Sequence, residues 1–505
     1  LLALNIKAAL LTPEDLSSRA PLSDLGGLLI VANKAFSDRK HWQPQDGAFL
    51  KQAFVLTQQV APALQTAAKQ GGALLATVTR LDGAFGFKAK FDTNPLMGGL
   101  AGLVKTAAME WPQVACRAID VASDWEDGRT IAQTIAQELC FAHPGGPIEI
   151  GLDVDSRVNL VTQPAPYPSD NDLETGLNPC DVVLVTGGGR GVTAAALQAV
   201  ASHRQPTLIL MGRSPAPSPE PDWLTGLKHS RAIKKAILTH VFDSKPPAPR
   251  ELEEIYRAHM ANREITATIA SLQASGANVA YLSLDVRDAD QVATALANVR
   301  QTYGPIKGLI HGAGTLADRL ITAKTREQFN RVFDTKVAGL HALLAATRDD
   351  VLTQIVLFSS VAARTGNRGQ VDYAMANEVL NKVAWHEAWR RPDCKVTAIN
   401  WGPWDGGMVS ASLKMAFLRK HLPLIDLTEG GRCLVREMAS GRPAPAEIVL
   451  GGMMPDTAIE PVLKQPAPLA LSFKREIDLE TVPVLGSHML DGKPVVQLAL
   501  MAEWF

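Results

Sequence analysis

Short apolar runs alternate with helical patterns through the second half of the chain. Near-continuous runs of Val, Ile and Leu at 182–186 and 207–211, and the shorter apolar pair Leu309 and Ile310, are typical of strands buried on both faces. Between such runs, the segments 192–202 and 291–301 repeat apolar residues with a helical period. Strands that alternate with helices at this spacing predict a doubly wound, parallel, Rossmann-like α/β sheet.

The first 162 residues repeat the same rhythm more weakly. Apolar runs at 27–33, 72–81, 113–122 and 147–154 have the pattern of strands, and 45–70 has the pattern of a helix. No glycine-rich phosphate loop follows the first of these strands. We therefore expect a second α/β unit that lacks the residues for binding a nucleotide.

Proline-rich stretches mark the boundaries between these units. Residues 163–180 combine Pro, Asp, Asn and Gly without periodicity, and 214–222 has prolines at alternate positions. A further proline-rich patch at 245–249 follows a segment with a helical pattern, so these stretches frame an insertion at about 215–263. The expected units are residues 1–165, residues 178–465 and a tail of residues 466–505.

Composition excludes several classes of protein. The 505 residues carry 50 basic and 51 acidic side chains, a balance that gives no support to a nucleic-acid binder. No apolar run reaches the roughly 18 residues of a transmembrane helix. The five cysteines form no CxxC pair, which favours reduced thiols in a cytoplasmic protein over a disulfide framework or a metal site. The chain starts at Leu1 with neither Met nor a signal-peptide pattern, so we expect a piece of a longer polypeptide.

A glycine cluster follows the strand at 182–186 and precedes a helical segment. Glycines let the backbone turn tightly and approach a pyrophosphate, which the free N–H groups at a helix N-terminus bind. Such a cluster alone is also compatible with an ordinary turn, but the strand–loop–helix context favours a dinucleotide site. The predicted cofactor loop comprises Gly187, Gly188, Gly189, Arg190, Gly191 and Val192.

The next strand ends in Gly212, Arg213 and Ser214. A site that prefers NAD tends to place an acidic residue there, against the 2′-hydroxyl of the ribose. Arg213 instead offers a cation and Ser214 a hydroxyl, both suited to a 2′-phosphate, and Arg190 could assist. The sequence therefore predicts NADPH as the cofactor.

Two further segments follow strands of the same series. Asp285 and Val286 come at the end of the third strand, where the Asp can accept a hydrogen bond from an adenine amino group. The segment after the fourth strand has small residues where the backbone must pass close to a cofactor. This segment consists of His311, Gly312, Ala313 and Gly314.

The candidate catalytic residues lie farther along the chain. Ser360 ends a strand, at the carboxyl edge of the sheet where ligands of such folds bind. Tyr373 and Asn377 are four residues apart and so share one face of a helix. Reduction of a ketone by hydride needs a proton donor at the carbonyl oxygen, and a Tyr hydroxyl serves if a nearby cation lowers its pKa. Lys336, in an earlier helical segment, can supply that charge.

The residues from Val182 to Met408 resemble a short-chain dehydrogenase/reductase, in particular the ketoreductase domain of polyketide and polyunsaturated-fatty-acid synthases. In that family the catalytic Lys lies in a K-V-x-G segment before the Ser, and an Asn follows the Tyr in Y-x-x-x-N. Lys336, Ser360, Tyr373 and Asn377 match this pattern residue for residue. Ordinary members of the superfamily carry Y-x-x-x-K instead, so the match is specific to the synthase branch.

The resemblance extends to the rest of the chain. The segment from Asn94 to Ala122 is similar to the structural subdomain of these ketoreductases, a truncated Rossmann-like unit that supports the catalytic one. Thr193 departs from the family pattern, because the last glycine of the cofactor loop is expected there. The segment with Trp404 and Met408 resembles the border of the substrate lid. The tail resembles the start of a hotdog-fold dehydratase domain, with His488 in the place of the catalytic base.

The resemblance implies an NADPH-dependent β-ketoacyl reductase within a multifunctional synthase. Its substrate would be a β-ketoacyl thioester on an acyl carrier protein domain, and neighbouring synthase domains would be further partners. Tyr373 would donate the proton, Ser360 would hydrogen-bond the carbonyl oxygen, and Lys336 with Asn377 would orient the Tyr and lower its pKa. Two alternatives stay open: a catalytically silent scaffold, and a free-standing reductase of a small ketone.

Three positions bear on the handedness of the product. In the polyketide family, the class that forms the D-configured (3R) alcohol carries an L-D-D-like motif just after H-x-A-G, and the opposite class carries a Trp before the Tyr. Leu316 and Asp318 keep two positions of the first motif, and Thr365 stands where the second class has Trp. The resemblance therefore implies the D-β-hydroxyacyl thioester as product.

Overall fold

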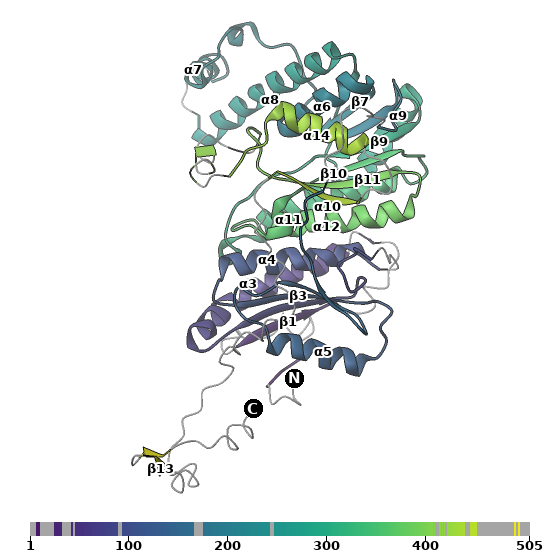
Figure 1. Cartoon of the computed structure of the whole chain (residues 1–505). Coiled ribbons are helices and arrows are strands. Elements are labelled where there is room, and N and C mark those ends of the chain that lie inside the picture. Colours follow the sequence, from purple (N-terminus) through teal and green to yellow (C-terminus); the bar gives the residue numbers. More distant parts are fainter. Residues whose placement is uncertain are drawn as a thin grey trace.

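Two β-sheets, one of five strands and one of seven, organise the part of the chain that the structure describes. The structure is a computed structural model (Figure 1). It describes residues 7–10, 25–32, 42–43, 46–88, 93–165, 175–242, 247–407, 409, 414–415, 417, 419, 422–439, 445–451, 489–490 and 493–494. The predictions for Met408 and for His488 lie outside these residues.

The larger sheet is parallel throughout, in the order β12-β11-β10-β9-β6-β7-β8. Val, Ile and Leu fill its central strands because both faces are covered, which removes the need for alternating polar residues. This architecture confirms the predicted fold class. The strands are β6 (Val182–Thr186), β7 (Thr207–Gly212), β8 (Asn278–Ser283), β9 (Ile306–His311), β10 (Gln354–Ser360), β11 (Lys395–Trp401) and β12 (Glu447–Leu450).

Helices cover both faces of this sheet (Figure 1). Successive residues of a strand point to opposite faces, so Val183 and Val185 contact one layer of helices and Val182 and Leu184 the other. The first layer comprises α6 (Gly191–Arg204), α8 (Pro249–Ala274) and α14 (Leu427–Ala439). The second layer comprises α9 (Ala289–Tyr303), α10 (Arg326–Ala346) and α12 (Val371–Arg390), with the short α11 (Val361–Thr365) before α12.

The smaller sheet has the order β1-β2-β3-β4-β5, with β1 to β4 parallel and β5 antiparallel to β4. We call residues 25–165 the N-terminal unit and residues 175–451 the C-terminal unit. Helices α3 (Asp46–Gln70) and α4 (Gly99–Glu110) lie on the face toward the larger sheet, and α5 (Gly128–Cys140) lies on the other (Figure 1). The strands are β1 (Gly27–Val31), β2 (Leu74–Thr79), β3 (Ala115–Val121), β4 (Glu149–Leu152) and β5 (Arg157–Asn159).

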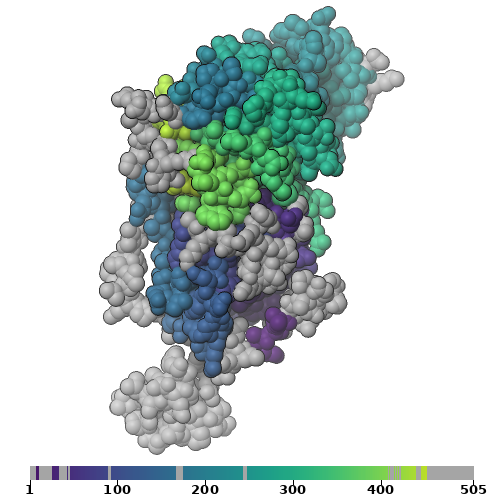
Figure 2. Space-filling model, turned by 90° about the vertical axis from the view of Figure 1, so that its right-hand side faces the viewer, coloured from purple at the N-terminus to yellow at the C-terminus, as the bar shows by residue number. Residues whose placement is uncertain are grey.

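The two units share one apolar core. Helix α4 of the N-terminal unit packs along α12 of the C-terminal unit, and both contribute side chains such as Leu100 and Met375 to the same cluster. A Cβ atom at Gly102 would lie 2.8 Å from the backbone of Ala374, so a larger residue there would force the helices apart. In Figure 2 the purple and blue N-terminal unit lies directly below the green part of the C-terminal unit.

The insertion forms a lobe at the end of the molecule farthest from the N-terminal unit (Figures 1 and 2). It contains the 3-10 turn η3 (Asp222–Leu224), α7 (Ser230–His240) and the first part of α8. Leu224, Ile233 and Ile237 form its apolar core. The later part of α8 contacts α6 and β8 and buries Ile265 and Leu272. Helix α8 therefore joins the insertion to the larger sheet.

The remaining elements are short. The 3-10 turns η2 (Pro95–Gly98) and η4 (Ile321–Ala323) precede α4 and α10 respectively. Strands β13 (Met489–Leu490) and β14 (Lys493–Pro494) pair in antiparallel fashion. Among the helices of the described ranges, none is long and apolar enough to cross a membrane.

Candidate functional site

A cleft of about 620 Å³ opens at the carboxyl ends of β6, β7, β8 and β9. The order of the sheet reverses here, because β7 and β8 follow on one side of β6 and β9 follows on the other. Open α/β sheets bind ligands at such a switch point. The cleft brings together most of the residues predicted to hold the cofactor: Gly187, Gly189, Arg190, Gly191, Val192, Gly212, Arg213, Ser214, Asp285, Val286, Gly312, Ala313 and Gly314.

The glycine loop lies between β6 and α6. Gly187 and Gly191 have φ angles of +71° and +67°, a region that residues with a side chain rarely adopt. A Cβ atom at Gly187 would also lie 2.8 Å from the Gly312 carbonyl oxygen. Gly188 faces the core rather than the cleft, since a Cβ atom there would lie 2.6 Å from the Val185 side chain. Because α6 begins at Gly191, its first backbone N–H groups lie at the cleft.

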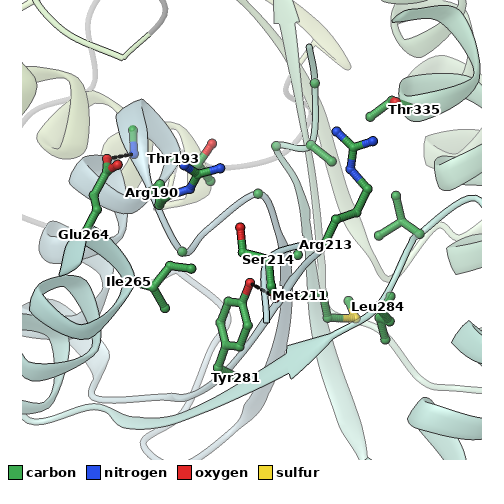
Figure 3. Close-up of a pocket in the computed structure, with 18 of the residues that line it drawn as sticks. Arg190, Thr193, Met211, Arg213, Ser214, Glu264, Ile265, Tyr281, Leu284 and Thr335 are labelled. Carbon is green, nitrogen blue, oxygen red and sulfur yellow. Dashed lines mark hydrogen bonds between the residues drawn. The ribbon is translucent and has the colours of Figure 1, made fainter. Parts of the chain in front are cut away.

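Arg213 and Ser214 stand at the edge of the cleft, directly after β7. Figure 3 shows the Arg190 and Arg213 side chains on either side of Ser214. Tyr281 supports this edge from β8, because its hydroxyl donates a hydrogen bond of 3.0 Å to the Ser214 carbonyl oxygen. The Tyr281 hydroxyl would lie 2.9 Å from a Cβ atom at Gly212, which explains why a residue without a side chain ends the strand.

The Asp285 carboxylate lines the cleft but is already bound within the chain. Arg287 donates hydrogen bonds to both of its oxygens, with an Nε–Oδ1 distance of 3.0 Å and an Nη2–Oδ2 distance of 2.6 Å. This bonding holds the pKa of Asp285 below its ordinary value. An adenine amino group would therefore share the carboxylate with Arg287, which the two lone pairs on each oxygen allow.

Glu264 reaches the cleft from α8, the helix that begins in the insertion. Its Oε1 accepts a hydrogen bond of 3.0 Å from the Gly191 N–H at the start of α6 (Figure 3). A carboxylate suits the partial positive charge of a helix N-terminus. A dinucleotide phosphate would bind the same N–H groups, so Glu264 and a phosphate would compete for this position.

His311 does not line the cleft, because its imidazole is fully buried. Nε2 lies 3.0 Å from the Lys336 carbonyl oxygen, and Nδ1 lies 2.9 Å from the Thr186 hydroxyl. A carbonyl only accepts, so Nε2 carries the proton and Nδ1 accepts from Thr186, whose oxygen accepts from the Ala313 N–H. Burial lowers the pKa of His311 to about 3, which keeps the ring neutral. The ring thus connects the cofactor cleft to α10.

The four candidate catalytic residues meet around the Tyr373 side chain. Ser360 lies at the carboxyl end of β10, where its oxygen accepts a hydrogen bond of 3.2 Å from the Ala362 N–H. Tyr373 and Asn377 occupy successive turns of α12, and the Asn377 amide donates to the Tyr373 carbonyl oxygen at 2.9 Å. Lys336 comes from α10, with its Nζ 5.5 Å from the centre of the Tyr373 ring. Three separate elements therefore position the set.

Burial dominates the electrostatics of these groups. It raises the pKa of the Tyr373 phenol above its ordinary value, although the Asn377 and Ser360 side chains act in the opposite direction. Burial also lowers the pKa of Lys336 to about 7. The Lys336 ammonium donates a hydrogen bond of 2.8 Å to the Phe358 carbonyl oxygen. The pKa of Tyr373 is raised overall because desolvation of the phenol outweighs the lowering effects of Asn377 and Ser360. The predicted effect of the Lys336 charge on this pKa stays a prediction.

Leu316 and Asp318 lie in the loop between β9 and η4. The Asp318 carboxylate accepts a hydrogen bond of 3.1 Å from the Gln370 Nε2. Gln370 stands three residues before Tyr373, and the negative charge of Asp318 contributes to raising the pKa of the phenol after desolvation. The structure therefore brings this loop, which we call the Leu316–Asp318 loop, close to the candidate proton donor.

Trp404 is buried in the apolar core of the C-terminal unit. Its side chain is 4 % exposed and belongs to the core between β11 and α14. The Trp401 and Trp404 ring centres are 4.7 Å apart, and the indole occupies the space beside Gly430 of α14. The large apolar ring fills the gap that this glycine leaves, so the indole serves the core, and the prediction that Trp404 borders the substrate lid stays a prediction.

Several residues that line the cleft were not predicted from the sequence. Glu264 and Ile265 come from α8, and no local pattern showed that this helix would reach the cofactor loop. Thr335 and Gly407 line the cleft from segments with no nucleotide-binding motif. Tyr281 could have been found, because alternation along β8 places it on the face that the glycine loop covers.

Comparison with known proteins agrees with the geometry. Residues 181–406 match the family model of the KR domain. One polypeptide of the polyunsaturated fatty acid synthase of Thraustochytrium sp. is 32 % identical over 437 residues, which are 84 % of this chain and 15 % of that protein. Polyketide synthase PksL of Bacillus subtilis is 29 % identical over 366 residues, or 70 % of this chain and 7 % of that protein. The chain thus spans a small part of each of these relatives.

Solved structures share the fold. A crystal structure of a ketoreductase domain from the bacillaene assembly line has a TM-score of 0.61 at 20 % identity, covering 86 % of this chain and 94 % of that one. An N-terminal ketoreductase from the macrolactin assembly line has a TM-score of 0.60 at 19 % identity, covering 85 % of this chain and 72 % of that one. The chain therefore contains a ketoreductase domain of the short-chain dehydrogenase/reductase superfamily, of the kind found in polyketide and polyunsaturated-fatty-acid synthases.

Proposed function

We propose that the chain reduces the 3-keto group of a β-ketoacyl thioester with NADPH. The thioester is carried by an acyl carrier protein domain, and the chain acts as one domain of a multifunctional synthase. The observation behind this proposal is the arrangement of Lys336, Ser360, Tyr373 and Asn377 beside the dinucleotide cleft. A purely structural unit has no physical need for this combination of side chains.

The residues of the cleft fit NADPH. The positive φ angles of Gly187 and Gly191 leave the backbone open to a pyrophosphate, and the start of α6 offers N–H donors. Arg213 and Ser214 offer a cation and a hydroxyl to a 2′-phosphate, with Arg190 nearby. Asp285 would accept from the adenine amino group. When bound, NADPH would supply the hydride for carbon 3 of the substrate.

The catalytic residues have separate roles in this proposal. The Tyr373 hydroxyl donates its proton to the carbonyl oxygen as the C–H bond forms at carbon 3. Its raised pKa keeps the phenol protonated until that step. The Ser360 hydroxyl donates a hydrogen bond to the developing alkoxide, and Asn377 holds the Tyr turn of α12. Lys336 places a positive charge near the ring, which favours the phenolate that remains after the proton has left.

The domain organisation follows from these roles. Residues 178–465 would form the catalytic part, with the insertion at about 215–263, and residues 1–165 would form a structural part without cofactor residues. Residues 466–505 would lead into a dehydratase-like domain. The Leu316–Asp318 loop and Thr365 support the D-configured product, because they match the family pattern for that class. Neighbouring synthase domains would supply the carrier-bound substrate.

The decisive variant is Tyr373→Phe, which removes the proton donor and keeps the ring. We expect the rate of NADPH oxidation with a β-ketoacyl thioester to fall about 100-fold or more, the scale of general-acid catalysis. Binding of NADPH, followed by nicotinamide fluorescence, should stay unchanged. Tyr303→Phe at the exposed end of α9 is the matched control, and it should keep full activity. Near wild-type turnover by Tyr373→Phe would refute the assignment.

Measurements of NADPH binding and of turnover also distinguish the two alternatives. No binding of NADPH at tens of micromolar would favour a catalytically silent scaffold. Turnover of small ketones without turnover of acyl thioesters would favour a free-standing reductase.

Chiral chromatography of the product tests its handedness. We expect mainly the D-β-hydroxyacyl thioester, and a predominantly L product would contradict the assignment of the Leu316–Asp318 loop. Asp318→Ala should reduce selectivity more than rate, because the carboxylate borders the phenol without taking part in proton transfer.

A further inference from the structure

Helix α4 of the N-terminal unit ends beside the candidate active site. It packs closely along α12, because Gly102 has no side chain and lies against the backbone of Ala374, the residue after Tyr373. Its last residue is Glu110, which is partly buried. The N-terminal unit therefore contacts the turn of α12 that carries the candidate proton donor.

Both oxygens of the Glu110 carboxylate accept hydrogen bonds from the C-terminal unit. Oε2 accepts from the Ile321 N–H at 2.8 Å, and Oε1 accepts from the Gly369 N–H at 2.9 Å. Ile321 begins η4, directly after the Leu316–Asp318 loop, and Gly369 lies just before α12. The Arg319 N–H also donates to the Gly369 carbonyl oxygen at 2.9 Å. One carboxylate thus links η4 to the residues that directly precede α12, the helix of Tyr373.

Gln58 of α3 holds the same turn from its other side. Its Nε2 donates hydrogen bonds to the Ile321 carbonyl oxygen at 2.6 Å and to the Lys324 carbonyl oxygen at 2.7 Å. Gln58 therefore donates hydrogen bonds to carbonyl groups at η4, whereas Glu110 accepts a hydrogen bond from an N–H group of η4. A turn held in this way has little freedom to shift without breaking hydrogen bonds that water would have to replace.

Lys324 connects this turn to the active site. Its ammonium is fully buried and donates hydrogen bonds of 2.7 Å to the Ala317 carbonyl oxygen and to Oδ2 of Asp372. Ala317 lies between Leu316 and Asp318, and Asp372 directly precedes Tyr373. A displacement of η4 would therefore move both the Leu316–Asp318 loop and the start of α12.

We propose that Glu110 and Gln58, from the N-terminal unit, are positioning residues that set the Leu316–Asp318 loop relative to Tyr373 and so determine how the substrate enters. The catalytic consequence rests on the proposed function. The hydrogen bonds by which Glu110 and Gln58 hold η4 and Gly369, which we call the clamp, do not depend on that function. Neither residue lines the cleft, and the hydrogen bonds described above go to backbone groups of Ile321, Lys324 and Gly369, so both would act through η4 and Gly369.

Glu110→Gln is the sharpest variant, because both native oxygens face N–H donors. A glutamine keeps the size of the side chain and turns one acceptor into an NH₂ group, which cannot accept a hydrogen bond from its N–H partner. Amide hydrogen exchange followed by mass spectrometry should be at least about tenfold faster in peptides covering 315–324 and 367–372, as expected for loss of one charge-assisted hydrogen bond. Peptides from β6 and β10 should be unchanged. Glu126→Gln, on the exposed surface of the same unit, is the matched control.

Kinetics with a β-ketoacyl thioester test the catalytic consequence. Glu110→Gln and Gln58→Leu should each raise KM about five- to tenfold and lower the ratio of D to L product, while kcat changes less than about twofold. The dissociation constant of NADPH should stay at the wild-type value. A merely structural defect would lower the melting temperature and weaken NADPH binding along with activity, which would overturn the proposal.

The outcomes distinguish the two hypotheses. A wild-type chain that does not reduce the thioester would contradict the proposed function, while faster exchange in Glu110→Gln would still support the clamp. Unchanged exchange in both peptides, or an active Glu110→Gln variant with wild-type KM and product ratio, would overturn the clamp and leave the proposed function intact.

Discussion

Arg213 shows how one residue at the end of a strand can decide the choice of cofactor. It lines the cleft after β7, in the position where an acidic residue would repel a 2′-phosphate and bind a free ribose hydroxyl. A guanidinium reverses both preferences, because it attracts the phosphate through directional, charge-assisted hydrogen bonds. The proposed preference for NADPH therefore depends mainly on a single side chain.

Arg213→Ala tests this preference. We expect the dissociation constant of NADPH to rise about 10- to 100-fold, the equivalent of a charged hydrogen bond of roughly 1.5–3 kcal/mol. The dissociation constant of NADH should change little, because NADH has no 2′-phosphate. Fluorescence titration of both cofactors measures the two constants, and equal losses for both would contradict the role of Arg213.

His311 predicts an acid sensitivity of the fold. Burial, and secondarily the charge of Lys336, lower its pKa from the ordinary 6.5 to about 3 in the folded state. Between these values the unfolded chain binds a proton that the folded chain does not. The stabilisation is therefore fully present above about pH 6.5 and is lost as the pH falls, by about 1.4 kcal/mol per pH unit from this residue.

Urea unfolding at pH 7, 5.5 and 4.5 measures this effect. The free energy of unfolding should fall less steeply with decreasing pH in His311→Gln than in the wild type, although the variant is less stable at pH 7. His229→Gln, at an exposed position, should keep the wild-type slope. Equal slopes for His311→Gln and the wild type would show that the imidazole is not buried as a neutral ring.

At the scale of elements, α8 links the insertion to the cofactor cleft. Its exposed Glu264 bonds the first N–H of α6, while Ile265 on the next position is buried against the same region. The helix therefore brings a negative charge to the place where the cofactor phosphates would bind. Electrostatic repulsion between carboxylate and phosphate opposes cofactor binding unless the side chain moves away.

Glu264→Gln should tighten the binding of NADPH and NADH equally, by about three- to tenfold, because both cofactors carry the pyrophosphate. Arg213→Ala, in contrast, distinguishes the two. Glu254→Gln on the exposed part of the same helix is the matched control and should leave both constants unchanged. Weaker binding in Glu264→Gln would instead show that the carboxylate supports the glycine loop.

At the scale of the whole molecule, a buried network of charges joins the two units. It contains three cations and three carboxylates. The desolvation free energy of burying these groups without partners would be far larger than the attraction within any one pair. Although burial raises the pKa of Glu378, the charges of Arg364 and Lys105 hold it far below its ordinary value. The members are Lys105, Glu149, Arg364, Glu378, Lys382 and Glu447.

We expect this network to specify how the units fit together more than it stabilises them. Lys105 and Glu149 come from the N-terminal unit and the others from the C-terminal unit, so a shift of one unit would leave charges without partners in the core. Asn381 and Asn400 connect the network to Ser359, next to Ser360. The position of the N-terminal unit is therefore coupled to the candidate active site from two directions, through these charges and through Glu110.

The amino-acid sequence by itself determined the elements and the chemical candidates. Apolar periodicity indicates which face of each strand and helix is buried, and this local pattern predicted the parallel sheet. The glycine loop could be predicted because its glycines stand together between a strand and a helix. The match of Lys336, Ser360, Tyr373 and Asn377 to one family pattern identified the candidate site. Their catalytic roles stay predictions.

Only the tertiary structure decided which elements meet. The bonds of Glu264 to α6, of Arg287 to Asp285 and of Glu110 to η4 depend on side-chain directions and on the packing of whole helices. Trp404 shows the same limit, because the family motif did not indicate that the indole packs against α14 and is buried there. Periodicity indicates that a residue is buried, but it does not identify the residue against which it packs. That partner depends on contacts between segments far apart in the chain.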